Sequence, residues 1–279
     1  MRVAAADGGI EIPVLGMGTW CFGGRTEHDP GNDDAGQIAV LQQGIEMGFG
    51  LIDTAEYYAA GYAETLVGKA IRGVDRRRLF ITSKVWKSNA SKENVLRACE
   101  NTLKRLGCDY LDCYLYHHYN PEIPLEETMG ALNELVEQGM TRSIGVSNFS
   151  AALLQKAMEY SSVPVVMNQV HCNLAVREAQ ENLETFCREN GVIFQAWRPV
   201  RDLESTPECA ALCAKYGITF QQLALAWLLN HEGFSVITAM KNPRHLAETM
   251  AAPEIKFEEE EMALLNDYPF RRPCGVALA

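Results

Sequence analysis

The stretch of sequence that decides the fold is Leu51-Ile52-Asp53-Thr54-Ala55-Glu56-Tyr57-Tyr58. It begins as the end of a short buried strand, and the carboxylate of Asp53 follows at once. Two later apolar runs end in the same way, one at Lys84 and the next at His117. Successive strands therefore each deliver one ionisable side chain at the carboxyl end. A barrel of parallel strands carries its chemistry at that rim.

Length and composition favour one large α/β domain. The chain has 279 residues, of which 47% are hydrophobic, and parallel α/β barrels use about 250 residues as a single domain. The net charge is −11, and no basic cluster is longer than Arg76-Arg77-Arg78. We therefore expect binding neither to nucleic acid nor to an anionic membrane.

The cysteines and the first residues indicate a cytoplasmic protein. Nine cysteines are scattered through the chain, which is typical of free thiols in a reducing compartment. Residues 1–15 contain Asp7 and Glu11 and no apolar signal core, and no apolar run is long enough to span a membrane. Cys209 and Cys213 could share a helix face, but no companion ligands follow them, so no metal site is expected.

Strand and helix patterns alternate eight times along the chain. Strands are predicted near residues 14–17, 49–53, 79–84, 111–117, 141–146, 165–170, 192–197 and 234–237. Helices are predicted near residues 34–47, 63–71, 91–106, up to 139, 150–160, 178–190, 207–216 with 220–230, and from 243, with Ser91 and Ser150 as N-caps. An extra helix is expected at 258–265. Eight such units predict a single-domain (β/α)8 TIM barrel over residues 1–279.

The side chains at the strand ends suit proton transfer. Tyr58 is the candidate acid, although a free tyrosine has a pKa of about 10. An ammonium at Lys84 would lower that pKa, and a shift of about three units corresponds to roughly 4 kcal/mol. Asp53 would supply the countercharge, and His117 could orient a substrate oxygen.

Each of these residues also has an ordinary explanation. A lone lysine after a strand is usually solvated, and an aspartate there often begins a turn. His117-His118 could be a surface pair or part of a metal site. The proton-transfer interpretation depends on all of them meeting at one rim.

Several short stretches occur along the chain in a fixed order. They are Gly18-Thr19-Trp20, Asp53-Thr54-Ala55 with Tyr58, Glu64-Thr65-Leu66-Val67-Gly68, Lys84-Val85-Trp86, Leu115-Tyr116-His117, Gly145-Val146-Ser147-Asn148-Phe149 and Asn168-Gln169-Val170. In this order they resemble the aldo-keto reductase family over nearly the whole chain. In that family the matching positions form the catalytic tetrad, here Asp53, Tyr58, Lys84 and His117.

The resemblance also implies a nicotinamide cofactor that lies extended across the barrel mouth. The positions matching the family's cofactor contacts at the first two strands are Gly18, Thr19, Trp20 and Asp53. By motif match the nicotinamide carboxamide would be held by Ser147, Asn148 and Gln169, although Ser147 and Asn148 could instead cap the next helix. The substrate pocket would be walled by Trp20, Trp86 and His118.

Besides His118, which stands near a place where the family often has a tryptophan, two stretches on the cofactor side depart from the family pattern. The family commonly has Tyr-Ser-Pro-Leu where this chain has Trp197-Arg198-Pro199-Val200. Trp197 could stack on the nicotinamide, with Pro199 beside it. Arg198 could meet the pyrophosphate or could face solvent.

The second departure is at the eighth strand, where the frequent Ile-Pro-Lys-Ser reads Ile237-Thr238-Ala239-Met240. Lys241 and Arg244 lie beside the lost positions and could bind the 2′-phosphate of the cofactor. Glu248 matches an adenine-side acid of the family, or is simply an exposed helix residue.

The expected activity is NAD(P)H-dependent reduction of a small-molecule aldehyde or ketone to an alcohol. NADPH is the default cofactor, and NADH stays possible. Two alternatives remain open: a cofactor-binding regulatory subunit with little turnover, and a barrel aldolase that uses Lys84 as a Schiff base. A monomer is favoured, and the sequence does not name the substrate.

Overall fold

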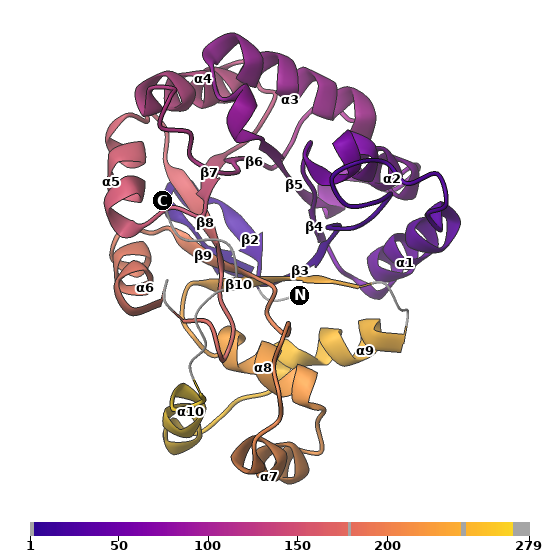
Figure 1. Ribbon diagram of the computed structural model, residues 1–279, viewed down its shortest axis with the longest axis vertical. Helices are drawn as coiled ribbons and strands as arrows, with labels where there is room; N and C mark the ends of the chain where they lie inside the picture. The colour runs from indigo at the N-terminus through magenta and orange to yellow at the C-terminus, as the bar shows by residue number, and fades with distance from the viewer. Residues whose placement is uncertain (1–2, 178–179, 241–243, 270–279) are drawn as a thin grey trace.

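The protein is a closed barrel of parallel strands surrounded by helices (Figure 1). The computed structural model describes residues 3–177, 180–240 and 244–269. Around the barrel the strands follow the order β10-β3-β4-β5-β6-β7-β8-β9. The predicted (β/α)8 TIM barrel is therefore confirmed.

The elements fall close to their predicted positions. The barrel strands are β3 (Leu15–Gly18), β4 (Leu51–Asp53), β5 (Phe80–Val85), β6 (Cys113–Tyr116), β7 (Ile144–Ser147), β8 (Val165–His171), β9 (Ile193–Trp197) and β10 (Phe234–Ala239). The helices are α1 (Asp34–Met47), α2 (Tyr62–Ala70), α3 (Lys92–Leu106), α4 (Leu125–Glu137), α5 (Ala151–Glu159), α6 (Gln180–Glu189), α7 (Pro207–Tyr216), α8 (Phe220–Leu229), α9 (Arg244–Ala251) and α10 (Glu259–Asn266). The extra C-terminal helix is α10. The predicted start of the sixth helix, residues 178–179, lies outside the described residues.

Alternation along the strands separates two cores. Side chains that point inward form a small apolar cluster in the barrel, which includes Leu51, Leu115, Met167 and Ile193. Successive side chains of a strand face opposite sides, so their neighbours point outward to the helices. Gly16 on β3 makes room for the inner cluster, because a Cβ atom there would come within 2.4 Å of the Leu51 side chain.

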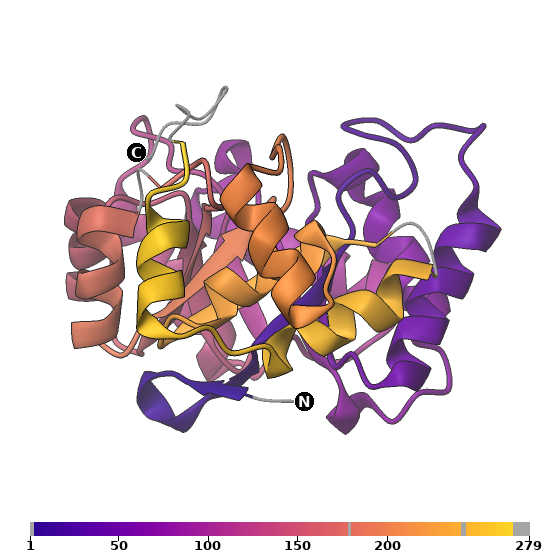
Figure 2. The same ribbon diagram turned by 90° about the horizontal axis from the view of Figure 1, so that it is seen from below.

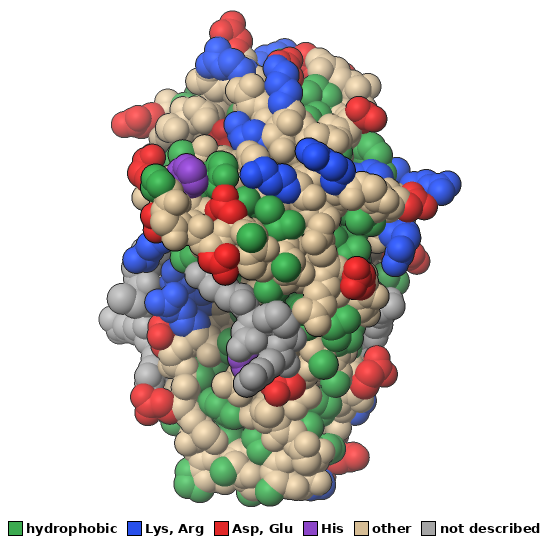
Figure 3. Space-filling model, turned by 90° about the vertical axis from the view of Figure 1, so that its right-hand side faces the viewer, with side chains coloured by type: hydrophobic (Ala, Val, Ile, Leu, Met, Phe, Trp, Pro, Cys, Tyr) green, Lys and Arg blue, Asp and Glu red, His purple; other side chains and the backbone are tan. Residues whose placement is uncertain are grey.

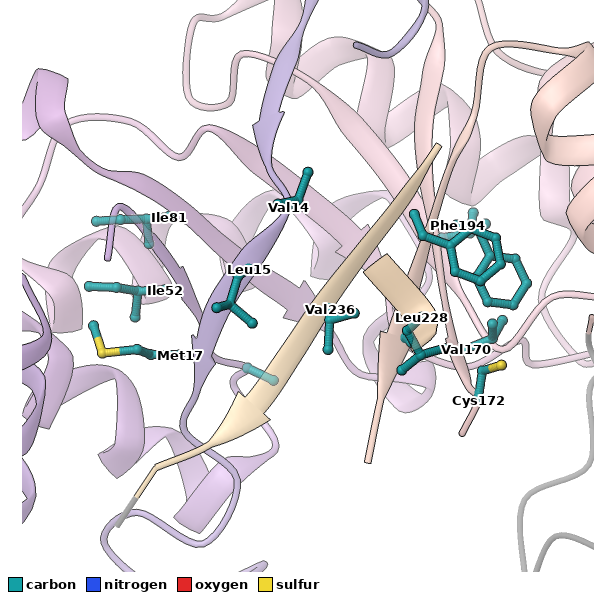
Figure 4. Close-up of a cluster of buried hydrophobic side chains, with 14 of the residues drawn as sticks. Val14, Leu15, Met17, Ile52, Ile81, Val170, Cys172, Phe194, Leu228 and Val236 are labelled. Atoms are coloured by element: carbon teal, nitrogen blue, oxygen red, sulfur yellow. The ribbon is translucent and has the colours of Figure 1, made fainter. Parts of the chain in front are cut away.

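The larger core lies between the barrel and the helices. Figure 4 shows Met17, Ile52 and Ile81 gathered beside β3, and all are fully buried or nearly so. Gly44 lets α1 approach this layer, since a Cβ atom at that position would come within 2.3 Å of the Met17 sulfur. Burial of these side chains contributes roughly 1.5–3 kcal/mol each and fixes the rim of the barrel.

A β-hairpin closes the other end of the barrel and was not predicted. Strands β1 (Val3–Ala5) and β2 (Glu11–Pro13) pair antiparallel. Figure 2 shows this indigo hairpin below the barrel, opposite the long loop between β3 and α1. Its Ile12 side chain is fully buried in the inner cluster. The hairpin thus forms the floor, and the carboxyl ends of the strands form the open rim.

Helix caps are supplied partly as expected. Ser150 accepts a hydrogen bond from the backbone N–H of Leu153 and caps α5. Ser91 is the N-cap residue of α3 as predicted, but its side chain makes no capping hydrogen bond. Instead the N–H of Lys92 donates to Glu127 Oε1 at 2.8 Å. A carboxylate from the next helix therefore satisfies an N–H group at the start of α3.

The surface is charged and mixed. On the face shown in Figure 3, Lys and Arg side chains are interspersed with Asp and Glu, and hydrophobic side chains are scattered among them. None of the helices in the described part of the chain is both long and apolar enough to cross a membrane.

Candidate active site

The predicted acid, cation and carboxylate meet at the rim. Asp53 ends β4, Lys84 lies near the end of β5, and both point inward. The Lys84 Nζ donates to Asp53 Oδ1 at 2.7 Å, to the Thr54 carbonyl at 2.8 Å and to Tyr58 Oη at 3.2 Å. One ammonium therefore joins the carboxylate to the phenol.

Lys84 stays charged although it has no exposed surface. Burial alone would lower its pKa, but the Asp53 carboxylate and Tyr58 raise the pKa above its ordinary value. Three acceptors around Nζ satisfy the three donors of an ammonium. The Lys84–Asp53 ion pair therefore has the complete hydrogen bonding that a buried ion pair needs to be stable.

The pKa of Tyr58 differs from the prediction. Burial raises it above the ordinary value, and the Lys84 ammonium lowers it only in part. The predicted lowering of the Tyr58 pKa is therefore wrong, because the cost of burying a phenolate outweighs the attraction of the Lys84 ammonium. Tyr58 is a protonated phenol through the neutral pH range.

An unusual turn aims Tyr58 into the barrel. The two residues after it, Ala59 and Ala60, have left-handed φ values of 50° and 53°, which cost roughly 1–2 kcal/mol each for residues other than glycine. The backbone N–H of Ala59 donates to the Arg25 carbonyl at 2.7 Å. The long loop after β3 thereby holds the turn that carries the phenol.

His117 faces the phenol as a neutral ring. Its ring centroid lies 5.7 Å from that of Tyr58 and 5.0 Å from that of Trp86, edge-on to both. Burial lowers the pKa of His117 well below its ordinary value, and the nearby Lys84 lowers it further. His117 Nδ1 has no hydrogen-bond partner among the described residues. A neutral imidazole can hydrogen-bond to a carbonyl compound without adding charge.

The side-chain amide of Asn148, directly after β7, connects the two histidines to Trp197. The Asn148 Nδ2 donates to the His117 carbonyl and approaches His118 Nε2, both at 3.2 Å. Its Oδ1 accepts from Trp197 Nε1 at 3.2 Å. Trp197 also stacks on His171, with ring centroids 4.5 Å apart and planes 13° apart. The indole is thus fixed on one face and at its nitrogen.

A cavity of about 380 Å³ lies between these walls. Most of the predicted site residues line it, namely Gly18, Trp20, Asp53, Tyr58, Trp86, His117, His118, Ser147, Asn148, Gln169, Trp197, Arg198 and Pro199. Two others lie behind this surface. Lys84 sits beneath Tyr58, and Thr19 turns its hydroxyl to the Asp53 carbonyl at 3.0 Å.

Sequence reasoning missed Tyr57, one residue of the cavity wall. Tyr57 stacks on Trp86, with centroids 3.7 Å apart and planes 11° apart. Glu56 fixes this pair, because its Oε1 accepts from the backbone N–H of Trp86 at 2.6 Å and from Asn89 Nδ2 at 3.0 Å. The adjacent aromatic in the Tyr57-Tyr58 pair was the only signal in the sequence.

The loop after β9 brings cations to the mouth. Arg198 has a left-handed φ of 56°, and the Asn173 side chain donates to the carbonyls of Arg198 and Arg201. The Arg198 guanidinium lies 5.1 Å from the Trp197 ring centroid, and Arg201 pairs with Asp202 at 3.4 Å. The Arg198 guanidinium therefore lies beside the Trp197 indole, where it could bind an anion.

The three residues predicted to contact the 2′-phosphate and adenine end of the cofactor are only partly covered by the described residues. Lys241 lies outside the described residues, and Arg244 begins α9 without a described side chain. Glu248 on α9 is half-exposed and approaches His245 Nδ1 at 3.6 Å. Glu248 does not line the cavity.

The fold and the rim geometry define a (β/α)8 barrel with a buried Asp–Lys–Tyr set at its open end. The chain matches the model of the Aldo/keto reductase family over residues 14–268 and belongs to this family. It is 33% identical over 276 residues to methylglyoxal reductase YeaE of Escherichia coli strain K12, covering 94% of this chain and 93% of that protein.

Solved structures of aldo-keto reductases have the same fold as this chain. The thermostable aldo-keto reductase Tm1743, in complex with the inhibitor epalrestat, has a TM-score of 0.93 and 43% identity, covering 96% of this chain and 100% of that one. The aldo/keto reductase of Klebsiella pneumoniae in complex with NADP and acetate has a TM-score of 0.86 and 35% identity, covering 99% and 98%. The chain is an NAD(P)H-dependent aldo-keto reductase, an oxidoreductase that acts on carbonyl compounds.

Proposed function

We propose that Tyr58 protonates the carbonyl oxygen of a substrate that lies in the cavity between Tyr58 and Trp197. The observation that carries this role is the hydrogen bond between Lys84 Nζ and Tyr58 Oη, at 3.2 Å, with Asp53 2.7 Å behind the ammonium. As the proton leaves, the ammonium stabilises the phenolate that forms. His117 hydrogen-bonds to the same oxygen and holds it near the phenol.

The residues along the cavity suit a nicotinamide cofactor. Trp197 offers a fixed indole face, and Gln169 offers an amide group beside it. A dihydronicotinamide held there would supply the hydride for the reduction. Ser147, Asn148 and Gln169 would orient its carboxamide, Trp197 would support its ring, and Arg198 would bind its pyrophosphate. The aromatic walls exclude water from the reacting atoms.

The substrate we propose is a small aldehyde or ketone. The wall made by Trp20, Tyr57 and Trp86 is flat and apolar, and the cavity of about 380 Å³ is near the lower end of ligand-site volumes. Two of the similar proteins from Escherichia coli are named as methylglyoxal reductases. Methylglyoxal is therefore the first compound to test, beside a simple aromatic aldehyde.

The test is the consumption of reduced cofactor. With the purified chain, NADPH absorbance should fall when either carbonyl compound is added, and the corresponding alcohol should accumulate. Tight cofactor binding without consumption over a broad carbonyl panel would favour a regulatory subunit. Trapping of Lys84 by borohydride, with no need for cofactor, would favour an aldolase.

We also propose a moderate preference for NADPH over NADH. Arg244 begins α9, and a helix N-terminus with a guanidinium favours a phosphate group. One charge-assisted hydrogen bond contributes roughly 1.5–3 kcal/mol, so NADPH should bind at least about tenfold more tightly. Dissociation constants of both cofactors should converge in Arg244→Ala. Equal constants for the wild type, or an unchanged ratio in the variant, would contradict this assignment.

The setting we propose is a single-domain, monomeric enzyme of the cytoplasm. The eight cysteines in the described part of the chain are free thiols, which suits a reducing compartment. Gel filtration over a range of protein concentrations would test the monomer.

A further inference from the structure

A row of buried polar side chains leads away from Asp53 through the barrel. Gln169 Nε2 donates to Asp53 Oδ2 at 2.8 Å and to Gln195 Oε1 at 2.7 Å. Gln195 Nε2 donates to Ser235 Oγ at 3.1 Å, and Ser235 Oγ donates to the Pro13 carbonyl at 3.0 Å. Strand register brings the row together, because Gln169 pairs with Gln195 on β9 and Gln195 pairs with Ser235 on β10.

The row is sealed from solvent. Gln195 and Ser235 are 0% exposed, and Gln169 and Asp53 are 2% and 1% exposed. A buried donor or acceptor that loses its partner is left unsatisfied, because water cannot replace the partner. Each group in the row therefore has an orientation that is determined by the orientation of its neighbours.

The two ends of the row fix its direction. The Asp53 carboxylate and the Pro13 carbonyl can only accept hydrogen bonds. Ser235 must then give its proton to Pro13 and accept from Gln195. Gln195 in turn presents its oxygen to Gln169. Both hydrogens of the Gln169 amide are thereby used, and its carbonyl oxygen is the group left for the cavity that it lines.

From this geometry we infer that Gln195 and Ser235 are positioning residues, which hold Gln169 as a hydrogen-bond acceptor toward the nicotinamide carboxamide and as a donor toward Asp53. Gln169 is then the link between the cofactor wall and the Asp53–Lys84–Tyr58 set. The inference deepens the proposed function and rests on it.

The consequence is selectivity for a carboxamide. The NH₂ group of NADP⁺ can donate to the Gln169 oxygen. The 3-acetylpyridine analogue has a methyl group in its place and leaves that oxygen unpaired. Without Gln195, one amide hydrogen of Gln169 loses its acceptor, and the amide is held only at Asp53. It then turns away from the carboxamide, and the selectivity falls.

The experiment is a calorimetric titration of NADP⁺ and its 3-acetylpyridine analogue into the full chain. Wild type should prefer NADP⁺ by about tenfold, and Gln195→Met, which keeps the side-chain volume, should reduce the preference to about twofold or less. Ser235→Ala should lower the preference by a smaller factor. The Gln195 oxygen can still accept from Gln169, but Gln195 itself is held less firmly.

Ser143→Ala is the matched control. Ser143 is also buried, and its hydroxyl donates to the Asp112 carbonyl at 2.6 Å, away from the cavity. It should lose thermal stability and keep the full preference. Variants at Gln195 and Ser235 that behave like this control would overturn the inference. A wild-type chain that binds neither dinucleotide would contradict the proposed function itself.

Discussion

At the scale of single residues, burial and charge compete at Tyr58, the proposed acid, and at Lys84 beside it. The ammonium keeps its charge because Asp53 lies 2.7 Å away, and removing one partner of such a buried pair typically costs about 3–5 kcal/mol. The phenol lies at the edge of the pair and is nearly buried as well. Burial raises the pKa of Tyr58, so its proton is available for transfer at neutral pH.

This balance predicts the pH dependence of the reaction. A general acid must be protonated, and its contribution is lost only as the pH rises through its pKa. Since the pKa of Tyr58 is raised above about 10, kcat/KM for carbonyl reduction should stay level from about pH 6 to about pH 9. His117 adds no break, because its pKa is lowered well below about 6.5.

The measurement is a pH profile of kcat/KM for reduction with saturating NADPH, beside the profile of the reverse oxidation. Oxidation needs the phenolate and should rise with pH over the same range. An inflection of the reduction profile near pH 7 would contradict the assignment of Tyr58 as the acid.

At the scale of elements, the turn after Tyr58 stores strain. Ala60 is exposed and has φ 53° and ψ 39°, a conformation that suits glycine. Ala60→Gly should therefore raise the free energy of unfolding by up to about 1 kcal/mol, since relief of about 1–2 kcal/mol exceeds the added entropy of the unfolded chain.

Denaturant titration with matched m-values would measure this change. The control is Ala214→Gly, at an exposed position of helix α7, which should lose about 1 kcal/mol. If Ala60→Gly lost stability as the control does, the turn would not be strained.

The elements themselves could largely be predicted from the sequence. Helix α1 begins and ends at the predicted residues, and β4 ends at Asp53 as expected, because long periodic runs and buried apolar runs are strong local signals. The hairpin β1–β2 was missed because each strand has only three residues. Its stability comes from burying Ile12 under the barrel, which no local pattern records.

The candidate site could be predicted where strand ends or family motifs mark its residues. The strand-end pattern predicted His117 and motif order predicted Gln169, and both line the cavity. The proposed roles of Gln195 and Ser235 depend on strand register and could not be seen in one sequence. The pKa of Tyr58 was predicted in the wrong direction, because its direction depends on how completely the phenol is buried.

At the scale of the whole molecule, the apolar floor of the barrel and the rim with the candidate site lie at opposite ends. The rim carries the site, and the floor carries the hairpin with Ile12 in the inner cluster. Ile12→Ala should lower the free energy of unfolding by about 2–5 kcal/mol, because it leaves a cavity in a closed core. KM values for cofactor and substrate should not change, since the rim is at the opposite end (Figure 2).

Thermal unfolding and steady-state kinetics on the same preparation would test this division. Val3→Ala is the control, because Val3 on the same hairpin is 44% exposed, and it should change stability little. A large rise in KM for Ile12→Ala at a temperature where it is folded would show that floor and rim are coupled.

The central claim is that Tyr58 gives the proton in carbonyl reduction, and single-turnover reduction by Tyr58→Phe tests it most directly. Tyr62→Phe is the control, since Tyr62 donates its hydroxyl to Asp34 at 2.6 Å, outside the cavity. The rate with Tyr58→Phe should fall by about 10² to 10⁴, with the NADPH dissociation constant close to that of the wild type, while Tyr62→Phe keeps both. A near-wild-type rate for Tyr58→Phe would contradict the claim.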